Sequence, residues 1–168
     1  ASALSALLAQ AGTELGQEER EKLMAFKNER YRQLIEGLTP VDAFAGSHEA
    51  LVRCRERGLR IGVASASLNA GVVLERIGLQ RFIDFIADPH EAAPKPSAEI
   101  YRNACAALGA EPGHAVCVED GAPMIANLRA EGLYSVGVGL GPLGADEQFD
   151  SIAEWNVDAT LMWLKLRT

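Results

Sequence analysis

The chain has 168 residues, of which 48% are hydrophobic and 23% are charged, and this fits one medium-sized domain or a domain with a small appendage. Its formal net charge of -7 argues against nucleic acid as a partner, since that binding depends on Lys and Arg contacts to phosphates, but it permits a small phosphorylated ligand. The apolar runs fall short of the about 18–20 residues that a membrane span needs, and no signal-peptide pattern is present, so we expect a cytoplasmic protein without a membrane segment.

The first third of the chain is predicted to be helical. An apolar stripe over residues 3–11 stops near Gly12. A second helix is expected over residues 17–36, where Gly37 ends it and Pro40 lies just beyond. We interpret residues 1–38 as a partial helical cap on the rest of the protein.

From Gly46 onward the character of the chain changes, because helices alternate with short apolar runs. Glycine-terminated helices are predicted over residues 47–57, 70–77, 98–108 and 124–131, and a last helix over residues 159–166. Strands are predicted over residues 60–64, 82–87, 115–118 and 134–138. Such alternation indicates βα units and a doubly wound parallel sheet with both faces covered, so residues 39–168 are interpreted as an α/β core. The three cysteines, Cys54, Cys105 on a helix and Cys117 in a strand, are expected to be buried, reduced thiols.

Polar side chains follow three of the predicted strands, at the end where open parallel sheets bind their ligands. Ser65 follows the strand over residues 60–64, and the small residues after it lead into a helix beginning near Asn69. Hydroxyls and main-chain N–H groups at such a place suit a phosphate. The structural alternative is that Ser67 or Asn69 only caps the helix.

Lys95 lies between Pro94 and Pro96, in a loop after the strand over residues 82–87. Two prolines stiffen the loop and fix the direction of the ammonium group, which favours a functional role. A surface lysine in a rigid turn is the alternative.

The adjacent carboxylates Glu119 and Asp120 close an otherwise apolar strand. Hard cations such as Mg²⁺ prefer one or two carboxylates together with water and substrate oxygens. The alternative is that Asp120 caps the next helix. A hydroxyl, an ammonium group and two carboxylates at strand ends together favour a site for a phosphoryl group and a divalent cation.

These stretches resemble a known family. Residues 63–69, 74–77, 86–89, 95–96 and 118–120 are similar to the β-phosphoglucomutase branch of the haloacid dehalogenase superfamily. The resemblance covers nearly the whole chain and implies an α/β core of that superfamily. It also implies Mg²⁺-dependent phosphoryl transfer through an aspartyl-phosphate, which interconverts β-glucose 1-phosphate and glucose 6-phosphate.

The resemblance also implies roles for individual residues. Ser65 and Lys95 would contact the transferring phosphoryl group, and Lys95 would offset charge on its oxygens. Glu119 and Asp120 would hold Mg²⁺. The surroundings of the second phosphate of the sugar phosphate would be formed by Lys27, Ala66, Ser67 and Asn69.

The chain departs from the family pattern in ways that matter. Family members begin with a strand ending in Asp-x-Asp-Gly, which supplies the nucleophile and the general acid/base, and nothing here matches it. That strand is normally central, between the strands ending at Ala64 and Glu119, so two inner edges would be left unpaired. Gly121 and Met124 replace the usual Ser and Gly, and Met124 would crowd the metal.

Three functions remain open after these departures. The first is a β-phosphoglucomutase-like enzyme that is inactive as this chain alone, with the missing N-terminal segment as its partner. The second is a phosphatase of the same superfamily acting on small sugar phosphates. The third is a non-catalytic phosphate-binding protein that has lost its nucleophile.

Overall fold

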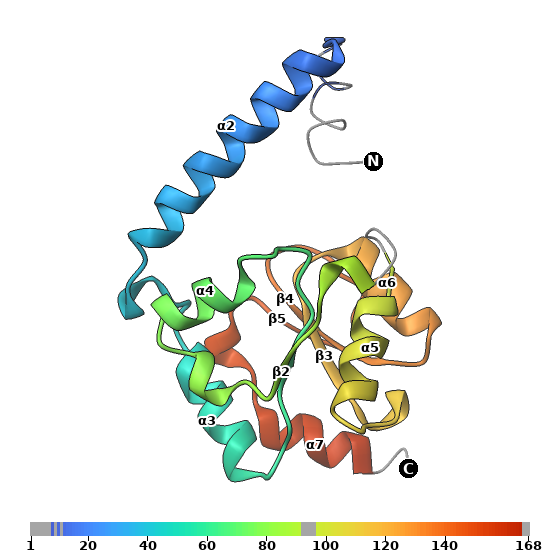
Figure 1. Ribbon diagram of the computed structural model, residues 1–168. Helices are drawn as coiled ribbons and strands as arrows, with labels where there is room; N and C mark the ends of the chain where they lie inside the picture. The colour runs from blue at the N-terminus through green and yellow to red at the C-terminus, as the bar shows by residue number, and fades with distance from the viewer. Residues whose placement is uncertain (1–7, 9, 11, 92–96, 166–168) are drawn as a thin grey trace.

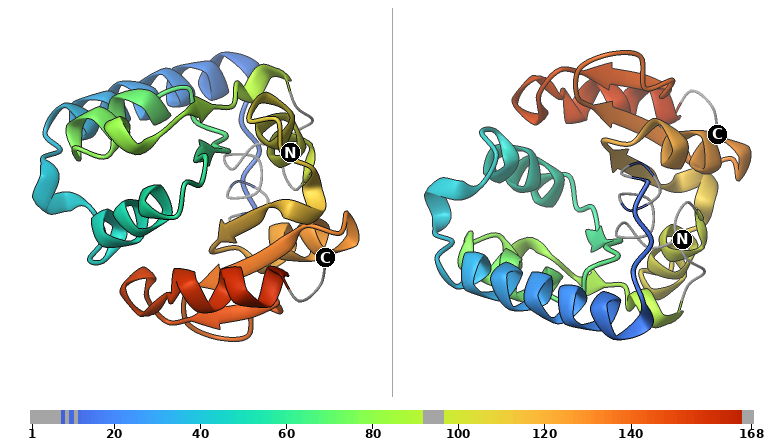
Figure 2. Two further views of the ribbon diagram at one scale, coloured as in Figure 1. Left: turned by 90° about the horizontal axis from the view of Figure 1, so that it is seen from below. Right: turned by 90° about the horizontal axis from the view of Figure 1, so that it is seen from above.

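The structure is a computed structural model that describes residues 8, 10, 12–91 and 97–165. The helix predicted over residues 3–11 lies almost wholly outside the described residues. The second predicted helix is confirmed as α2 (Gln17–Glu36). Figure 1 shows α2 extending away from the α/β body, and Figure 2 shows it beside α4 (Ala70–Arg76), with which it is in contact.

Most of the apolar side chains of α2 are exposed. Phe26 and Leu34 are each 65% exposed, whereas Ile35 at the end of the helix is buried. Within the described residues, the one fully buried side chain of this helix therefore lies at the end that joins the body.

The predicted alternation of helices and strands is confirmed, with shifted ends. The remaining helices are α3 (Ser47–Glu56), α5 (Glu99–Ala107), α6 (Ala122–Ala130) and α7 (Val157–Lys165). The glycines that follow α3 to α6 have left-handed φ values, which is why those helices stop there. Helix α6 begins two residues earlier than predicted because Pro123 fits the first turn of a helix.

The strands form two separate parallel sheets. Strand β1 (Gly62–Val63) pairs with β2 (Phe85–Ile86), with Gly62 opposite Phe85. Strand β3 (Val116–Glu119) pairs with β4 (Tyr134–Val138), which pairs with β5 (Glu147–Phe149). The predicted parallel α/β fold is confirmed. Its sheet is divided between β1 and β3, where the family resemblance implies two unpaired edges. Strand β5 was not predicted, because Glu147 and Gln148 interrupt the apolar pattern.

The main core lies where α5 and α6 pack on β3. Its buried members are Ala98, Cys105, Cys117, Met124, Leu128 and Leu133. The expectation that Met124 crowds a metal is wrong, since its side chain is only 4% exposed and packs into this core. The three cysteines are free and buried, as expected. Within the described residues, no helix combines the length and the apolar character that a membrane crossing requires.

Candidate active site

Ser65 and Ser67 lie in the short loop that joins β1 to α4, and two local hydrogen bonds shape this loop. The Ser65 hydroxyl oxygen accepts a hydrogen bond from the Ser67 N–H at 3.1 Å. The Ser67 hydroxyl oxygen in turn accepts one from the Asn69 N–H at 3.2 Å. Each hydroxyl thus turns the chain over two residues, which brings Ser65, Ser67 and Asn69 together beyond the end of β1.

The alternative that Ser67 or Asn69 only caps α4 is only partly supported. Asn69 is the N-cap residue of α4, but its side chain makes no capping hydrogen bond, and Ser67 bonds to the N-cap residue rather than to the helix. Ser65 and Ser67 are half-buried, while Ala66 is exposed. Because both hydroxyls accept, their hydrogens remain available as donors to a phosphate oxygen.

Glu119 is the last residue of β3, and its carboxylate is held from two sides. Its Oε1 atom accepts hydrogen bonds from the N–H groups of Asp120 at 3.1 Å and Gly121 at 3.2 Å. Its Oε2 atom accepts the hydroxyl of Tyr101 at 2.5 Å. The carboxylate is therefore fixed in orientation before any ligand binds.

Asp120 points into solvent rather than into the helix that follows. Its side chain is exposed, and the N-cap residue of α6 is Gly121, which has no side-chain cap. The capping alternative for Asp120 is therefore wrong. The geometry leaves Asp120 accessible next to a fixed Glu119.

Tyr101 on α5 is a residue that the sequence analysis missed. Its pKa is raised above the usual value for tyrosine, first by burial and then by the hydrogen bond to the Glu119 carboxylate. The hydroxyl therefore stays protonated and remains a donor to Glu119. Since 18 positions of sequence separate Tyr101 from Glu119, no local pattern could have indicated this contact.

Two predicted site residues, Lys27 and Lys95, are not placed with the Ser65 loop or with Glu119 by the described residues. Lys95 lies outside the described residues. Lys27 is exposed in the middle of α2 (Gln17–Glu36). The structure thus assembles the Ser65 loop and the Glu119–Asp120 pair, each at the end of its own strand.

The carboxylate oxygens of Glu119 and Asp120 are the kind of ligand that Mg²⁺ prefers. Carboxylate oxygens only accept hydrogen bonds, and they carry several lone-pair positions. Asp120 can supply a second oxygen, and Mg²⁺ commonly takes one or two carboxylates and keeps several waters. No cluster of three or more potential metal ligands occurs among the described residues, so a cation here would depend on water or substrate oxygens.

The parallel α/β architecture and the acidic pair at a strand end define the class of protein. The family model of the haloacid dehalogenase-like hydrolases matches residues 3–132, and the chain belongs to this family. Among individual proteins, the chain is 35% identical over 139 residues to β-phosphoglucomutase of Bacillus subtilis (strain 168). The match covers 81% of this chain and 62% of that protein, so the chain spans less than two thirds of the length of this relative.

Solved structures show the same likeness. The crystal structure of β-phosphoglucomutase from Clostridium difficile matches 98% of this chain and 76% of that one, with a TM-score of 0.88 and 27% identity. A mutant of CbbY from Rhodobacter sphaeroides in complex with xylulose-(1,5)bisphosphate matches 80% of this chain and 64% of that one, with a TM-score of 0.66 and 25% identity. The chain is therefore β-phosphoglucomutase-like in sequence and in fold.

Proposed function

We propose that the chain carries the phosphate-binding and Mg²⁺-binding part of a β-phosphoglucomutase-like site, which interconverts β-glucose 1-phosphate and glucose 6-phosphate. The observation that carries this proposal is the fixed Glu119 carboxylate beside the accessible Asp120, in a chain 35% identical to a β-phosphoglucomutase. The CbbY complex supports a sugar phosphate as the class of ligand.

In this proposal each residue has a defined task. Glu119 and Asp120 hold Mg²⁺, which when bound offsets negative charge on the phosphoryl oxygens. Ser65 donates its hydroxyl hydrogen to the transferring phosphoryl group, and Lys95 places a positive charge beside it. The second phosphate is held by the main-chain and side-chain groups of Lys27, Ala66, Ser67 and Asn69.

We further propose that residues 1–38 act as a partial cap over the core of residues 39–168, and that this chain alone is inactive. Phosphoryl transfer in this family passes through an aspartyl-phosphate, and the Asp-x-Asp-Gly motif that supplies the nucleophile is not matched in the sequence. Asp120, the accessible acidic residue at the site, is already assigned to the metal. The other half of the reaction would have to come from a segment bearing that motif.

Metal binding by the chain as it exists tests the core of this proposal. Titration calorimetry with Mg²⁺ is expected to show one site, and Asp120→Asn is expected to weaken binding at least tenfold. Asp150→Asn is the matched control, because Asp150 is an exposed aspartate that lies just after β5. Unchanged Mg²⁺ affinity in Asp120→Asn would reject the assignment of the metal site.

A phosphatase acting on small sugar phosphates is the second candidate, favoured by the hydrolase family model that the chain matches. The two reactions differ in whether water or a sugar phosphate receives the phosphoryl group. When a segment with the Asp-x-Asp-Gly motif is supplied, product analysis with β-glucose 1-phosphate separates them. Glucose 6-phosphate supports the mutase, and free phosphate as the main product supports the phosphatase.

A non-catalytic phosphate-binding protein is the third candidate. It predicts no Mg²⁺-dependent aspartyl-phosphate even with that segment present. Trapping of the phosphorylated state with a metal fluoride would reject it.

A further inference from the structure

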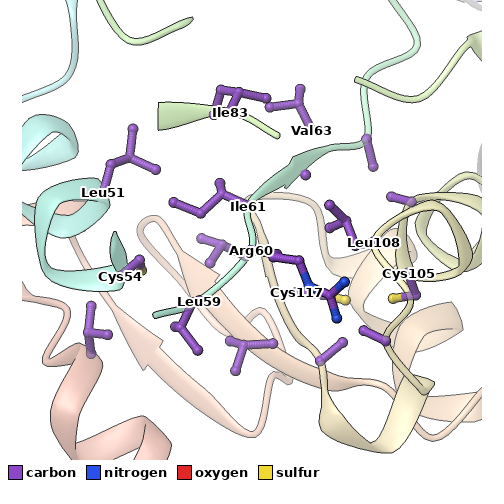
Figure 3. A pocket seen from close by; sticks show the side chains of 18 of the residues that line it. Leu51, Cys54, Leu59, Arg60, Ile61, Val63, Ile83, Cys105, Leu108 and Cys117 are labelled. Carbon is purple, nitrogen blue, oxygen red and sulfur yellow. The ribbon is translucent and has the colours of Figure 1, made fainter. Parts of the chain in front are cut away.

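Tyr101 lies in the first turn of α5, where its ring packs against two clusters of buried apolar residues. One cluster includes Cys105 and Cys117, and the other includes Ile100 and Ala104. Figure 3 shows the sulfur atoms of Cys105 and Cys117 turned towards each other, where α5 meets β3. Because a ring packed in this way has little room to move, the core sets the position of the Tyr101 hydroxyl oxygen.

The Tyr101 hydroxyl helps to orient the Glu119 carboxylate. It donates a hydrogen bond to Oε2, whereas the N–H groups of Asp120 and Gly121 donate to Oε1. These donors come from two different elements and bind different oxygens, so rotation of the carboxylate would break hydrogen bonds to both. Removal of the Tyr101 hydroxyl would take away a restraint on Oε2 and leave the two N–H groups on Oε1.

Freedom of rotation in a carboxylate affects which divalent cation it suits. Mg²⁺ demands near-octahedral coordination with oxygens at about 2.0–2.1 Å. Ca²⁺ accepts about six to eight oxygens at about 2.3–2.6 Å, in flexible geometry, and takes a carboxylate through one or both of its oxygens. A carboxylate that rotates can adapt to Ca²⁺, but it has to be ordered before it meets the stricter demand of Mg²⁺. A carboxylate that is already fixed therefore favours Mg²⁺.

We propose that Tyr101 is a positioning residue that sets the preference of the acidic pair for Mg²⁺ over Ca²⁺, through its hydroxyl on Glu119. This inference rests on the proposed function, which assigns Glu119 and Asp120 to the metal. Tyr101 acts through the carboxylate and is not itself a ligand. Hydrogen-bond partners of metal ligands commonly contribute about 10–100-fold to metal affinity.

A second tyrosine–glutamate pair in the chain provides a matched control. The Tyr134 hydroxyl donates to Oε1 of Glu147 at 2.7 Å. Tyr134 is paired with Val116 at the start of β3, whereas Glu119 at the end of β3 is paired with Gly137. Tyr134→Phe therefore removes the same kind of hydrogen bond at the opposite end of the sheet from the acidic pair.

Titration calorimetry of the full chain, with Mg²⁺ and separately with Ca²⁺, tests the proposal in the native chain, in Tyr101→Phe and in Tyr134→Phe. In Tyr101→Phe, Mg²⁺ affinity is expected to fall about tenfold and Ca²⁺ affinity by about threefold or less, so the preference for Mg²⁺ falls about threefold or more. Tyr134→Phe is expected to keep this preference. Partial unfolding would weaken the binding of both cations alike, so the ratio of the two affinities separates positioning from a purely structural role.

Glu119→Asp tests whether the effect passes through this carboxylate. The shorter side chain keeps the charge but draws the carboxylate away from the Tyr101 hydroxyl. On this background, Tyr101→Phe is expected to change the ratio of affinities by less than about twofold, as a double-mutant cycle requires of groups that act through one contact. An undiminished change would mean that Tyr101 acts by another route, which would reject the proposal.

Failure of this inference and failure of the proposed function give different results. Mg²⁺ binding by the native chain, with an unchanged preference in Tyr101→Phe, would overturn the role of Tyr101 and leave the metal site standing. An equal loss of preference in Tyr134→Phe would also overturn that role, because the effect would not depend on Glu119. Absence of Mg²⁺ binding by the native chain would reject the proposed function, and the role of Tyr101 with it.

Discussion

The hydroxyl of Tyr101 allows a direct test of how the acidic pair is held. Tyr101→Phe removes one hydrogen bond, at 2.5 Å to Glu119 Oε2, and leaves the ring in place. A hydrogen bond to a charged group contributes about 1.5–3 kcal/mol. We expect the lower half of this range, because Glu119 Oε1 keeps its bonds from two main-chain N–H groups. For a domain of this size, about 1.5–2.2 kcal/mol corresponds to a melting temperature lower by about 3–9 °C.

The pH dependence separates this hydrogen bond from a simple packing effect. The pKa of Tyr101 is raised in the folded state, so the stabilisation is fully present below the unfolded pKa of about 10. It is lost as the pH rises towards the folded pKa, because the unfolded chain then releases a proton that the folded chain retains. The difference in unfolding free energy between the native chain and Tyr101→Phe should therefore be constant from pH 7 to about pH 9 and shrink above pH 10.

Urea unfolding at a series of pH values measures this difference in unfolding free energy. An unchanged slope of the unfolding free energy against urea concentration shows that the variant exposes the same surface on unfolding. Tyr31→Phe is the control, since Tyr31 is 39% exposed on α2, and a change within about 0.5 kcal/mol is expected. A variant as stable as the native chain would show that Tyr101 does not hold Glu119. A difference that stays constant to pH 11 would show that Tyr101 ionises alike in the folded and unfolded chains.

Three further predictions concern the scaffold. Gly46→Ala is expected to lower the free energy of unfolding by well over the about 1–2 kcal/mol that a left-handed backbone costs a residue with a side chain, because the new Cβ would lie 2.3 Å from Ala153 Cα. Gly58→Ala is the control for urea unfolding, since its Cβ would meet no atom within 4 Å and the loss should stay within that range. Burial raises the pKa of Cys117 to about 12, so iodoacetamide at pH 8.5 should modify this thiol only in the unfolded chain, as measured by peptide mass spectrometry. Modification of Cys117 in the folded chain would contradict its burial. Hydrogen bonds from two arginines lower the pKa of Asp158 to about 2. Asp158→Asn should therefore lower the melting temperature at pH 7, and the difference should shrink as the pH falls from about 4 through about 2. A difference in melting temperature as large at pH 2 as at pH 7 would count against the pairing.

The fold was predictable because its signals are local. Each helix from α3 to α6 ends next to a glycine, and the apolar runs between the helices mark β1 to β4 within a few residues. The residues that build the Ser65 loop also lie within five positions of one another, so hydroxyls that turn the chain could be expected there. The division of the sheet was predictable from the family resemblance, which places a central strand between the strands ending at Ala64 and Glu119.

The contacts that complete the acidic pair were not predictable, because they depend on packing between distant segments. Tyr101 reaches Glu119 only because α5 packs beside β3, and the pattern of α5 alone shows a core-facing aromatic residue. The direction of Met124 was misjudged for the same reason. Comparison with a family motif locates position 124 near the metal, but the helix turns this side chain towards Leu128 and Cys117.

The divided sheet and the divided site have a single physical origin. Ser65 follows β1 and Glu119 ends β3, and a cavity lined by residues of both strands lies between them. Each half of the site therefore lies at the end of one edge of this cavity. A strand that pairs with both edges would end between the two halves, and pairing would set the spacing of β1 and β3 at about 9.6 Å, twice the spacing of adjacent strands. The Ser65 loop and the acidic pair would then be held at a defined separation by main-chain hydrogen bonds.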